Sequence, residues 1–190
     1  MLNRCEWCLK DEVYLQYHDL EWGVPVHEEQ KLFEFLVLEG AQAGLSWLTV
    51  LRKREAYRKA FDNFEPEKVA QYGQDKILEL INNKDIIRNK LKIEAAIKNA
   101  QSFLAIQDKF GSFDDYIWNF VDGQTIHNRF KTLKDIPAET EISQIISKDM
   151  KTRGFSFVGP TIIYSHMQAT GMVNDHLISC FRYQELGGAL

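Results

Sequence analysis

Residues 151–161 read Lys-Thr-Arg-Gly-Phe-Ser-Phe-Val-Gly-Pro-Thr. Gly154 and Gly159 stand five apart in this stretch, between two segments whose apolar residues recur at helical spacing, about 142–153 and 160–170. The sequence therefore predicts two helices joined by a glycine-containing turn. The first N–H groups of the second helix lack helical partners and could bind a phosphate, although most turns of this kind bind nothing.

The rest of the chain is also predicted to be helical. Pro160 suits the first turn of the second hairpin helix, and Gly171 suits the position just after its end. Ser46 is a good N-cap for one further helix, and another short helix is expected after Ser112. The additional predicted helices span residues 28–38, 46–61, 89–107 and 114–121. Because sustained period-two alternation is absent, we expect an all-α fold.

The chain has the length of one domain. Its 190 residues show no composition shift that marks a boundary, so we predict a single unit over residues 1–190. Within it we expect a helical lobe over about 28–110. A second lobe would combine both termini with the hairpin near 142–170. Turn-forming residues in 122–141 indicate an irregular connection.

Composition limits the function classes. Lys and Arg number 23 against 27 Asp and Glu, a net charge of −4, so bulk charge does not favour coating nucleic acid. Local basic clusters at 52–59 and 84–98 leave a smaller footprint open, although most such runs are solvated helix faces. No apolar run is long enough to span a membrane, and the N-terminus lacks a signal-peptide pattern. A cytoplasmic location is therefore expected. Three cysteines argue against a disulfide framework.

Several residues near both ends could bind a metal ion: Cys5, Cys8, His18, His176 and Cys180. His176 and Cys180 stand four apart, which predicts both on one face of a helix. Thiolates with imidazoles favour zinc, and four protein ligands make a closed, structural site. The alternative is that Cys5 and Cys8 are reduced surface thiols, and the sequence alone does not choose two of three thiols. The other histidines have no evident partner and are expected at surface or packing positions: His27, His127 and His166.

Aromatic residues and one carboxylate suggest a binding site. Glu39 follows the apolar run Phe35–Leu38 and lies between Trp22 and Trp47 in sequence. A carboxylate at the end of a buried stripe is a candidate for a functional group, although a solvent-exposed position at a helix end is the plain alternative. The aromatic set near it comprises Trp7, Tyr14, Tyr17, Trp22 and Trp47, and aromatic residues of this kind usually fill cores.

Five stretches carry a resemblance to a known family. They are Arg4-Cys5-x-Trp7, Tyr17-His18-Asp19-x-Glu21-Trp22-Gly23, Leu38-Glu39-x-x-Gln42-Ala43-Gly44-Leu45-Ser46-Trp47, Gly154-Phe155-x-Phe157-Val158-Gly159, and Asn174-Asp175-His176 followed by Cys180. These motifs are long and specific, and they run from about residue 4 to residue 180. Together they strongly resemble DNA-3-methyladenine glycosylase I, a helix–hairpin–helix glycosylase.

The resemblance implies a fold, a metal site and a base pocket. The fold would be all-α, with its hairpin unit in 142–170. The zinc ligands would be Cys5, His18, His176 and Cys180, which leaves Cys8 as an ordinary thiol. The base would be bound by Tyr17, Trp22, Trp47 and nearby Trp7, with Glu39 as the catalytic carboxylate.

The resemblance also implies a substrate and a way of binding it. Double-stranded DNA with an alkylated purine would be bound by a monomer, without an organic cofactor. The enzyme would flip 3-methyladenine out and hydrolyse its N-glycosidic bond. The residues expected to contact DNA are Gly44, Leu45, Lys151, Arg153, Gly154, Gly159 and Thr161. The resemblance does not assign a catalytic part to Asp175.

The chemistry of the substrate is consistent with a site made of aromatic residues and one carboxylate. An adenine alkylated at N3 is a cation within the nucleotide, so it leaves as a neutral base with little further protonation. Such an enzyme must bind the flipped base and stabilise the sugar cation, which favours aromatic faces and a carboxylate over a strong acid.

Two other function classes remain as alternatives. A metal-dependent phosphohydrolase could use His18-Asp19 and Asp175-His176, but it would need an open coordination position. A non-enzymatic DNA-binding module could be built on the hairpin alone. An intact function after Glu39→Gln would favour the second.

Overall fold

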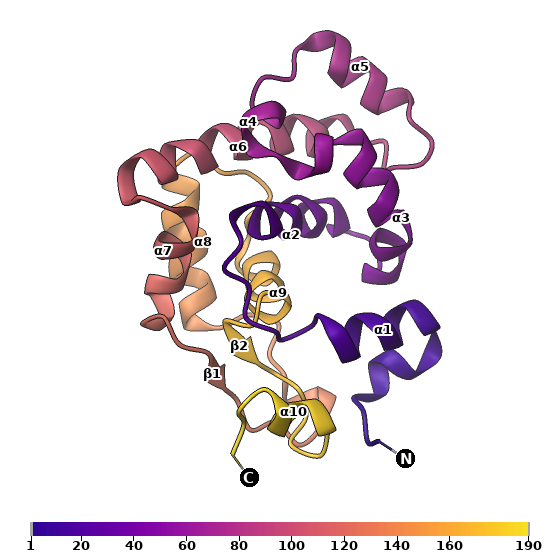
Figure 1. The fold of residues 1–190 in the computed structure, drawn as a ribbon, viewed down its shortest axis with the longest axis vertical. Coiled ribbons are helices and arrows are strands. Elements are labelled where there is room, and N and C mark those ends of the chain that lie inside the picture. Colours follow the sequence, from indigo (N-terminus) through magenta and orange to yellow (C-terminus); the bar gives the residue numbers. More distant parts are fainter. Residues whose placement is uncertain (1, 190) are drawn as a thin grey trace.

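The computed structural model describes residues 2–189 and is mostly helical, as expected (Figure 1). The α-helices are α1 (Glu12–Leu20), α2 (Glu29–Gln42), α3 (Trp47–Ala60), α4 (Pro66–Val69), α5 (Gln74–Asn82), α6 (Lys90–Phe110), α7 (Phe113–Trp118), α8 (Glu141–Thr152), α9 (Pro160–Ala169) and α10 (Phe181–Glu185). Short 3-10 helices are η1 (Glu6–Lys10), η2 (Asp62–Phe64), η3 (Asn119–Val121) and η4 (Leu133–Asp135). No helix among residues 2–189 is long and apolar enough to cross a membrane.

Helix α2 lies at the centre of the fold. Its residues 32–41 are all buried, because α3, α6, α7 and α9 pack around it. A largely apolar helix that is buried on every side requires neighbours all round it. On the α6 side the ring of Phe33 lies against that of Phe103, with centroids 5.3 Å apart. The same burial therefore applies to Glu39, the one carboxylate in the second half of α2.

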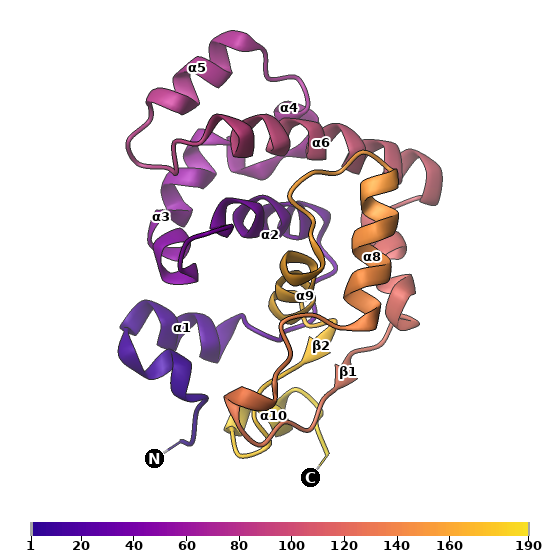
Figure 2. The same cartoon turned by 180° about the vertical axis from the view of Figure 1, so that it is seen from behind.

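The predicted hairpin is confirmed as α8 and α9, which pack against each other (Figure 2). Thr140 begins α8 with a capping box, and Pro160 occupies the first turn of α9. Gly171 follows the end of α9 with φ +73°, as the sequence predicted. A side chain there would also clash, because its Cβ would lie 2.4 Å from the backbone nitrogen of Pro25.

Both ends of the chain meet at one end of the molecule (Figures 1 and 2). The N–H of Phe181 donates to the carbonyl of Asn3 at 2.9 Å, and the Asn3 side chain donates to the carbonyl of Ser179. A short parallel pair, β1 (Ile126–His127) and β2 (Val173–Asn174), lies close by, with Ile126 opposite Val173. The sequence did not indicate these strands, because a two-residue strand carries no periodicity.

Three expectations about local structure were wrong or incomplete. Helices α1, α4 and α5 were not predicted. Helix α2 continues to Gln42, so Glu39 lies inside the helix and not at its end. His176 and Cys180 do not lie on a helix, because the chain turns between β2 and α10. The N–H of His176 donates to the side chain of Asn174, a local bond that favours this turn over a helix.

Candidate active site and metal centre

An aromatic cavity of about 380 Å³ lies between the N-terminal segment, α2, α3 and α9. Its volume is in the range of small-molecule sites. The four aromatic residues predicted to bind a base all line it, together with Glu39: Trp7, Tyr17, Trp22 and Trp47. Tyr14, the remaining member of the predicted aromatic set, also lines the cavity. The other lining residues were not predicted as part of a site: Gln42, Leu133, Ile136, Ser165, Gln168 and Ala169.

The rings of the cavity support one another at steep angles. Trp7 meets Trp22 edge-on, with centroids 5.2 Å apart, and Tyr14 at 5.3 Å. Tyr17 and Trp47 lie 5.7 Å apart. The Tyr14 hydroxyl accepts the N–H of Leu48 at 3.0 Å, so it also holds the start of α3 and with it Trp47. The Trp47 indole N–H is buried and has no acceptor within residues 2–189, which leaves a donor for a ligand.

Glu39 is buried against this cavity, so the solvent-exposed alternative is wrong. The side chain is 2 % exposed, and burial raises its pKa above the ordinary 4.5. Its Oε2 lies 2.9 Å from Nδ1 of His166, and this neighbour lowers the pKa in part. Its Oε1 has no hydrogen-bond partner among the described residues. The site therefore presents a carboxylate oxygen that a bound base with N–H groups would satisfy.

Cys5, His18, His176 and Cys180 converge at the junction of the two chain ends. All four are buried, and their ligand atoms lie within 4.8 Å of one another. Zinc bonds of about 2.3 Å to sulfur and 2.0 Å to nitrogen require tetrahedral ligands about 3.3–3.8 Å apart. Nε2 of His18 lies 3.2 Å from Nδ1 of His176, and Sγ of Cys180 lies 3.5 and 3.6 Å from these atoms. The four side chains therefore fit a zinc ion.

The second nitrogen of each imidazole is also held. Nδ1 of His18 lies 2.7 Å from a carboxylate oxygen of Asp19, which Arg4 binds with two of its nitrogens. Nε2 of His176 lies 2.9 Å from the carbonyl of Trp22. Such outer partners are typical of metal-binding histidines. Cys8 lies outside the group: it is buried, not a surface thiol, and its S–H donates to the carbonyl of Cys5 at 3.1 Å.

The hairpin connection, residues 153–159, is tightly held. The side-chain amide of Asn99 in α6 brackets Ser156, donating to its carbonyl at 2.9 Å and accepting its N–H at 2.8 Å. Ser147 donates to the carbonyl of Val158. Gly159 is the N-cap residue of α9. The surface beside it is open, since no neighbouring atom lies within 4 Å of where its Cβ would be. This surface allows a phosphate to approach the first N–H groups of α9.

The residues predicted to bind DNA at the hairpin differ in availability. Lys151 is exposed, and Thr161 is exposed at the start of α9. The Arg153 guanidinium is engaged with Asp149 and lies 4.7 Å from the ring centroid of Phe110. Lys151 is therefore the cation more readily offered to a phosphate.

Gly44 and Leu45 form an exposed turn between α2 and α3. Gly44 has φ +78°, which a residue with a side chain adopts at a cost, and Leu45 is 43 % exposed. Lys92 of α6 holds the turn from behind, because its Nζ donates to the carbonyls of Ala41 and Ala43 at 2.8 and 2.6 Å. The turn therefore presents an apolar side chain on a fixed support.

Asp175 does not line the aromatic cavity. It is 1 % exposed and accepts hydrogen bonds from Tyr164, Gln168 and Asn128. Three donors satisfy this carboxylate within the fold, so it links α9 to the segments that follow β1 and β2.

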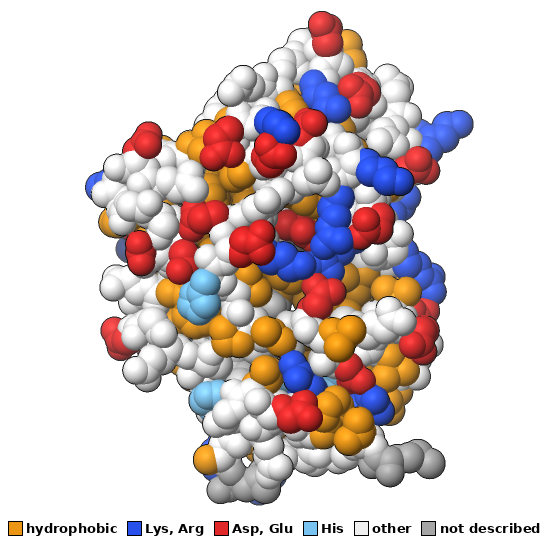
Figure 3. Space-filling model, viewed as in Figure 1, with side chains coloured by type: hydrophobic (Ala, Val, Ile, Leu, Met, Phe, Trp, Pro, Cys, Tyr) orange, Lys and Arg blue, Asp and Glu red, His pale blue; other side chains and the backbone are white. Residues whose placement is uncertain are grey.

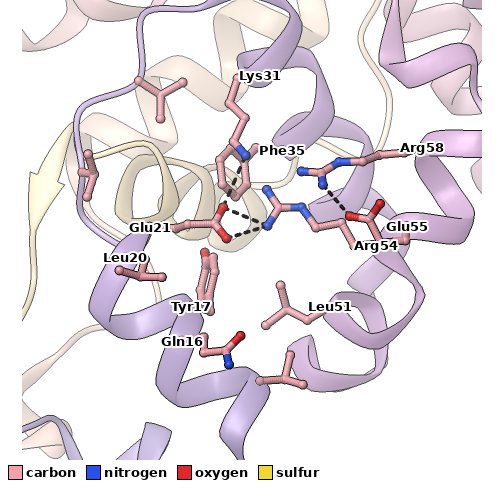
Figure 4. Close-up of a pocket in the computed structure, with 13 residues that line it drawn as sticks. Gln16, Tyr17, Leu20, Glu21, Lys31, Phe35, Leu51, Arg54, Glu55 and Arg58 are labelled. Atoms are coloured by element: carbon pink, nitrogen blue, oxygen red, sulfur yellow. Dashed lines mark hydrogen bonds and ion pairs between the residues drawn. The ribbon is translucent and has the colours of Figure 1, made fainter.

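Tyr17 also lines a second cavity, of about 540 Å³, between α1, α2 and α3 (Figure 4). Figure 4 shows Glu21 between Lys31 and Arg54, and Arg54 also pairs with Glu34. Cations and carboxylates alternate along this wall, so it favours neither a phosphate nor a cationic base. On the face drawn in Figure 3, acidic and basic side chains are likewise interspersed.

A helical hairpin beside an aromatic cavity with a buried carboxylate defines a class of enzyme, the DNA glycosylases that bind an extruded base. Residues 7–183 match the family model described as methyladenine glycosylase. DNA-3-methyladenine glycosylase 1 of Escherichia coli (strain K12) is 47 % identical over 182 residues, covering 96 % of this chain and 97 % of the relative. The chain belongs to the methyladenine glycosylase family, as its motifs predicted.

Solved structures agree with this assignment. A crystal structure of 3-methyladenine DNA glycosylase I superposes with a TM-score of 0.92 at 49 % identity, covering 94 % of this chain and 98 % of the other. A structure of 3-methyladenine DNA glycosylase I from Staphylococcus aureus, which addresses how that enzyme recognises 3-methyladenine, has a TM-score of 0.91 at 40 % identity. It covers 95 % of this chain and 96 % of the other. The activity predicted for this chain is thereby confirmed, and the phosphohydrolase and binding-module alternatives are set aside.

Proposed function

We propose that this chain removes 3-methyladenine from double-stranded DNA by flipping the nucleotide and hydrolysing its N-glycosidic bond, which leaves an abasic site. The observation that carries the proposal is the buried Oε1 of Glu39, which lacks a partner among the described residues beside the aromatic cavity. A carboxylate in that position binds a cationic methylated purine better than neutral adenine.

The aromatic residues and the carboxylate of the cavity have different roles in binding the base. Trp7, Tyr17, Trp22 and Trp47 offer ring faces and edges, and a cation over such a face gains about 0.5–2 kcal/mol. Glu39 accepts a hydrogen bond from the base and offsets its positive charge. The methylated base leaves as a neutral purine, so this chain needs no strong acid. Glu39 and the aromatic cavity favour the separating sugar cation over the intact nucleotide.

Two surfaces would hold the DNA. Leu45 at the tip of its turn is placed to fill the gap that the extruded nucleotide leaves, supported by Gly44. The hairpin would bind the backbone through the N–H groups after Gly159 and through Lys151, with Arg153, Gly154 and Thr161 beside them. With a net charge of −4, binding depends on these local contacts.

Zinc would have a structural part. Cys5, His18, His176 and Cys180 would hold the ion with no position left for water, so it would join the chain ends and take no part in hydrolysis. No organic cofactor is required. We further propose that the enzyme acts in the cytoplasm as a monomer.

The test is to incubate the protein with methylated duplex DNA and identify released bases by chromatography. We expect 3-methyladenine release that Glu39→Gln slows strongly. Glu28→Gln is the matched control, because it makes the same chemical change at the exposed N-cap of α2. A folded protein that releases no 3-methyladenine would contradict the proposal.

A further inference from the structure

Glu39 and His166 form a buried pair between α2 and the second hairpin helix, α9. The two side chains are 2 % and 1 % exposed, and Glu39 Oε2 lies 2.9 Å from His166 Nδ1. The other polar atom of each side chain, Glu39 Oε1 and His166 Nε2, is buried without a partner among residues 2–189. The pair is therefore isolated from the remaining polar groups of the fold.

This isolation determines which atom of His166 carries the proton. A charged imidazolium would bury an N–H at Nε2 without an acceptor, at a high cost. In a neutral ring protonated only at Nε2, the Nδ1 lone pair would face the carboxylate oxygen and repel it. A neutral ring with its proton on Nδ1 donates to Oε2 and leaves only a lone pair at Nε2. The geometry therefore favours His166 as a neutral donor and Glu39 as an ionised acceptor.

Few other groups act on the charge of Glu39. Of the helices packed against α2, α9 contributes His166, whose hydrogen bond to the carboxylate lowers the Glu39 pKa. From α1, Tyr17 faces Glu39 as a protonated phenol, because burial raises its pKa well above 10. No charged group of α3, α6 or α7 shifts the Glu39 pKa. His166 is thus the group in the described chain that opposes the protonation caused by burial.

We infer that His166 is a positioning residue: its Nδ1–H fixes Glu39 Oε2, keeps the carboxylate ionised and leaves Oε1 for the methylated base. This inference rests on the proposed function, since it names what prepares the base-binding carboxylate. Helix α9 begins at the hairpin connection, so the N-terminus of this helix would bind the DNA backbone. The same helix holds the Glu39 carboxylate through His166.

The test compares two amide substitutions of different reach. The side-chain nitrogen of Asn lies near where Nδ1 of His lies, whereas that of Gln reaches the position of Nε2. His166→Asn should therefore keep the donor to Glu39, and His166→Gln should lose it. Affinity for free 3-methyladenine is measured across a pH series, with single-turnover excision from methylated duplex as the second readout.

We expect His166→Gln to bind about tenfold more weakly near neutral pH, the lower end for a charge-assisted hydrogen bond. Its loss of affinity on acidification should begin at a higher pH than in the parent, and the deficit should shrink at alkaline pH. His166→Asn should stay close to the parent. In the Glu39→Gln background, His166→Gln should add little, because its partner charge is already gone.

Failure of this inference is distinguishable from failure of the proposed function. A parent protein that neither binds nor releases 3-methyladenine overturns the function. A parent that does both, with a His166→Gln pH profile that does not move, overturns the inference. Equal deficits in His166→Asn and His166→Gln at every pH, or additive deficits with Glu39→Gln, also overturn it, because they indicate packing alone. Should His166→Gln not fold, His166→Leu provides the variant without a donor.

Discussion

The indole of Trp22 lies edge-on against the imidazole of His176, with ring centroids 4.6 Å apart at 73°. The carbonyl of Trp22 also lies 2.9 Å from the Nε2 atom of the same histidine. Trp7 similarly meets His18, with centroids 5.4 Å apart. Trp7 and Trp22 of the aromatic cavity therefore pack against two candidate zinc ligands, so the candidate metal site and the cavity are in direct contact.

Loss of the metal should reduce stability first and base binding second. Joining Cys5 to Cys180 closes a loop of nearly the whole chain, and a cross-link of that length is worth on the order of 5 kcal/mol. We expect about one zinc per chain in the parent by elemental analysis. Cys180→Ser should lose it and lower Tm by roughly 10–20 °C. Cys8→Ser is the matched control and should keep both, since Cys8 lies outside the ligand group. An unchanged Tm in Cys180→Ser would refute the structural role.

The hairpin assignment is tested at Gly159. Its φ of −61° suits any residue, and no neighbour fills the space of a Cβ, so Gly159→Leu should fold normally. The larger side chain should block a phosphate and weaken binding to abasic duplex about tenfold at every salt concentration. Lys151→Ala should instead reduce the slope of log affinity against log salt by about 1. Parental binding by Gly159→Leu across the salt series would remove the hairpin from the interface.

The role of Leu45 is separable from base recognition. Leu45 is 43 % exposed, so Leu45→Ala should change the free energy of unfolding by less than about 0.5 kcal/mol. Because the side chain would occupy the gap in the duplex, we expect at least several-fold slower single-turnover excision from duplex DNA. Affinity for free 3-methyladenine, measured by calorimetry, should not change. Equal excision rates in the two proteins would argue that the turn does not enter the DNA.

Local signals explain why much of the fold could be predicted from the sequence. Ser46 and Ser112 accept N–H groups at the starts of α3 and α7, and Gly171 ends α9, all as the sequence indicated. Capping and turn residues act within a few positions, so their effect is visible without tertiary structure. Helix α5 also carries apolar residues at helical spacing, at Ile77 and Leu80, so its sequence contains a signal for a helix.

The features that could not be predicted from the sequence depend on contacts between residues far apart in the chain. The candidate metal residues and the aromatic set came together as predicted, but only the family motifs selected Cys5 over Cys8. His166 was expected to lack a partner, yet its partner Glu39 lies 127 residues away on another helix. The hold of Lys92 on the turn before Leu45 is likewise a contact between helices. No spacing rule in a single sequence encodes such pairs.

Asp175 should prove structural. Its carboxylate accepts three hydrogen bonds and lies outside the cavity lining. Asp175→Asn turns one acceptor oxygen into a donor facing other donors, which should cost about 1–3 kcal/mol in the free energy of unfolding. Single-turnover excision at a temperature where the variant is folded should fall less than tenfold. A loss of several hundredfold in a folded, zinc-containing variant would instead assign Asp175 to the chemistry.

Glu39→Gln removes the charge of the carboxylate that we propose binds the base, and it keeps the size of the side chain and one acceptor oxygen. A charge-assisted hydrogen bond is worth about 1.5–3 kcal/mol, so excision and binding of 3-methyladenine should fall roughly ten- to hundredfold. Burial raises the Glu39 pKa, so parental activity should fall as the pH drops through that raised value. The variant has no such group, so its slower rate should lack this acidic decline. Single-turnover kinetics across a pH series measure both effects.

Stability should change in the opposite direction to activity in the same variant. Because the folded-state pKa of Glu39 lies above the ordinary 4.5, the folded protein binds this proton more tightly than the unfolded chain. The contribution of Glu39 to stability is thus fully present below about pH 4.5 and is lost as the pH rises through the folded value. Glu39→Gln avoids that loss, so at pH 7 it should unfold at a denaturant concentration no lower than the parent. Trp47→Ala is the contrasting control, since it should weaken 3-methyladenine binding through lost contact area without moving the acidic decline. Parental excision by folded Glu39→Gln would remove the carboxylate from the mechanism.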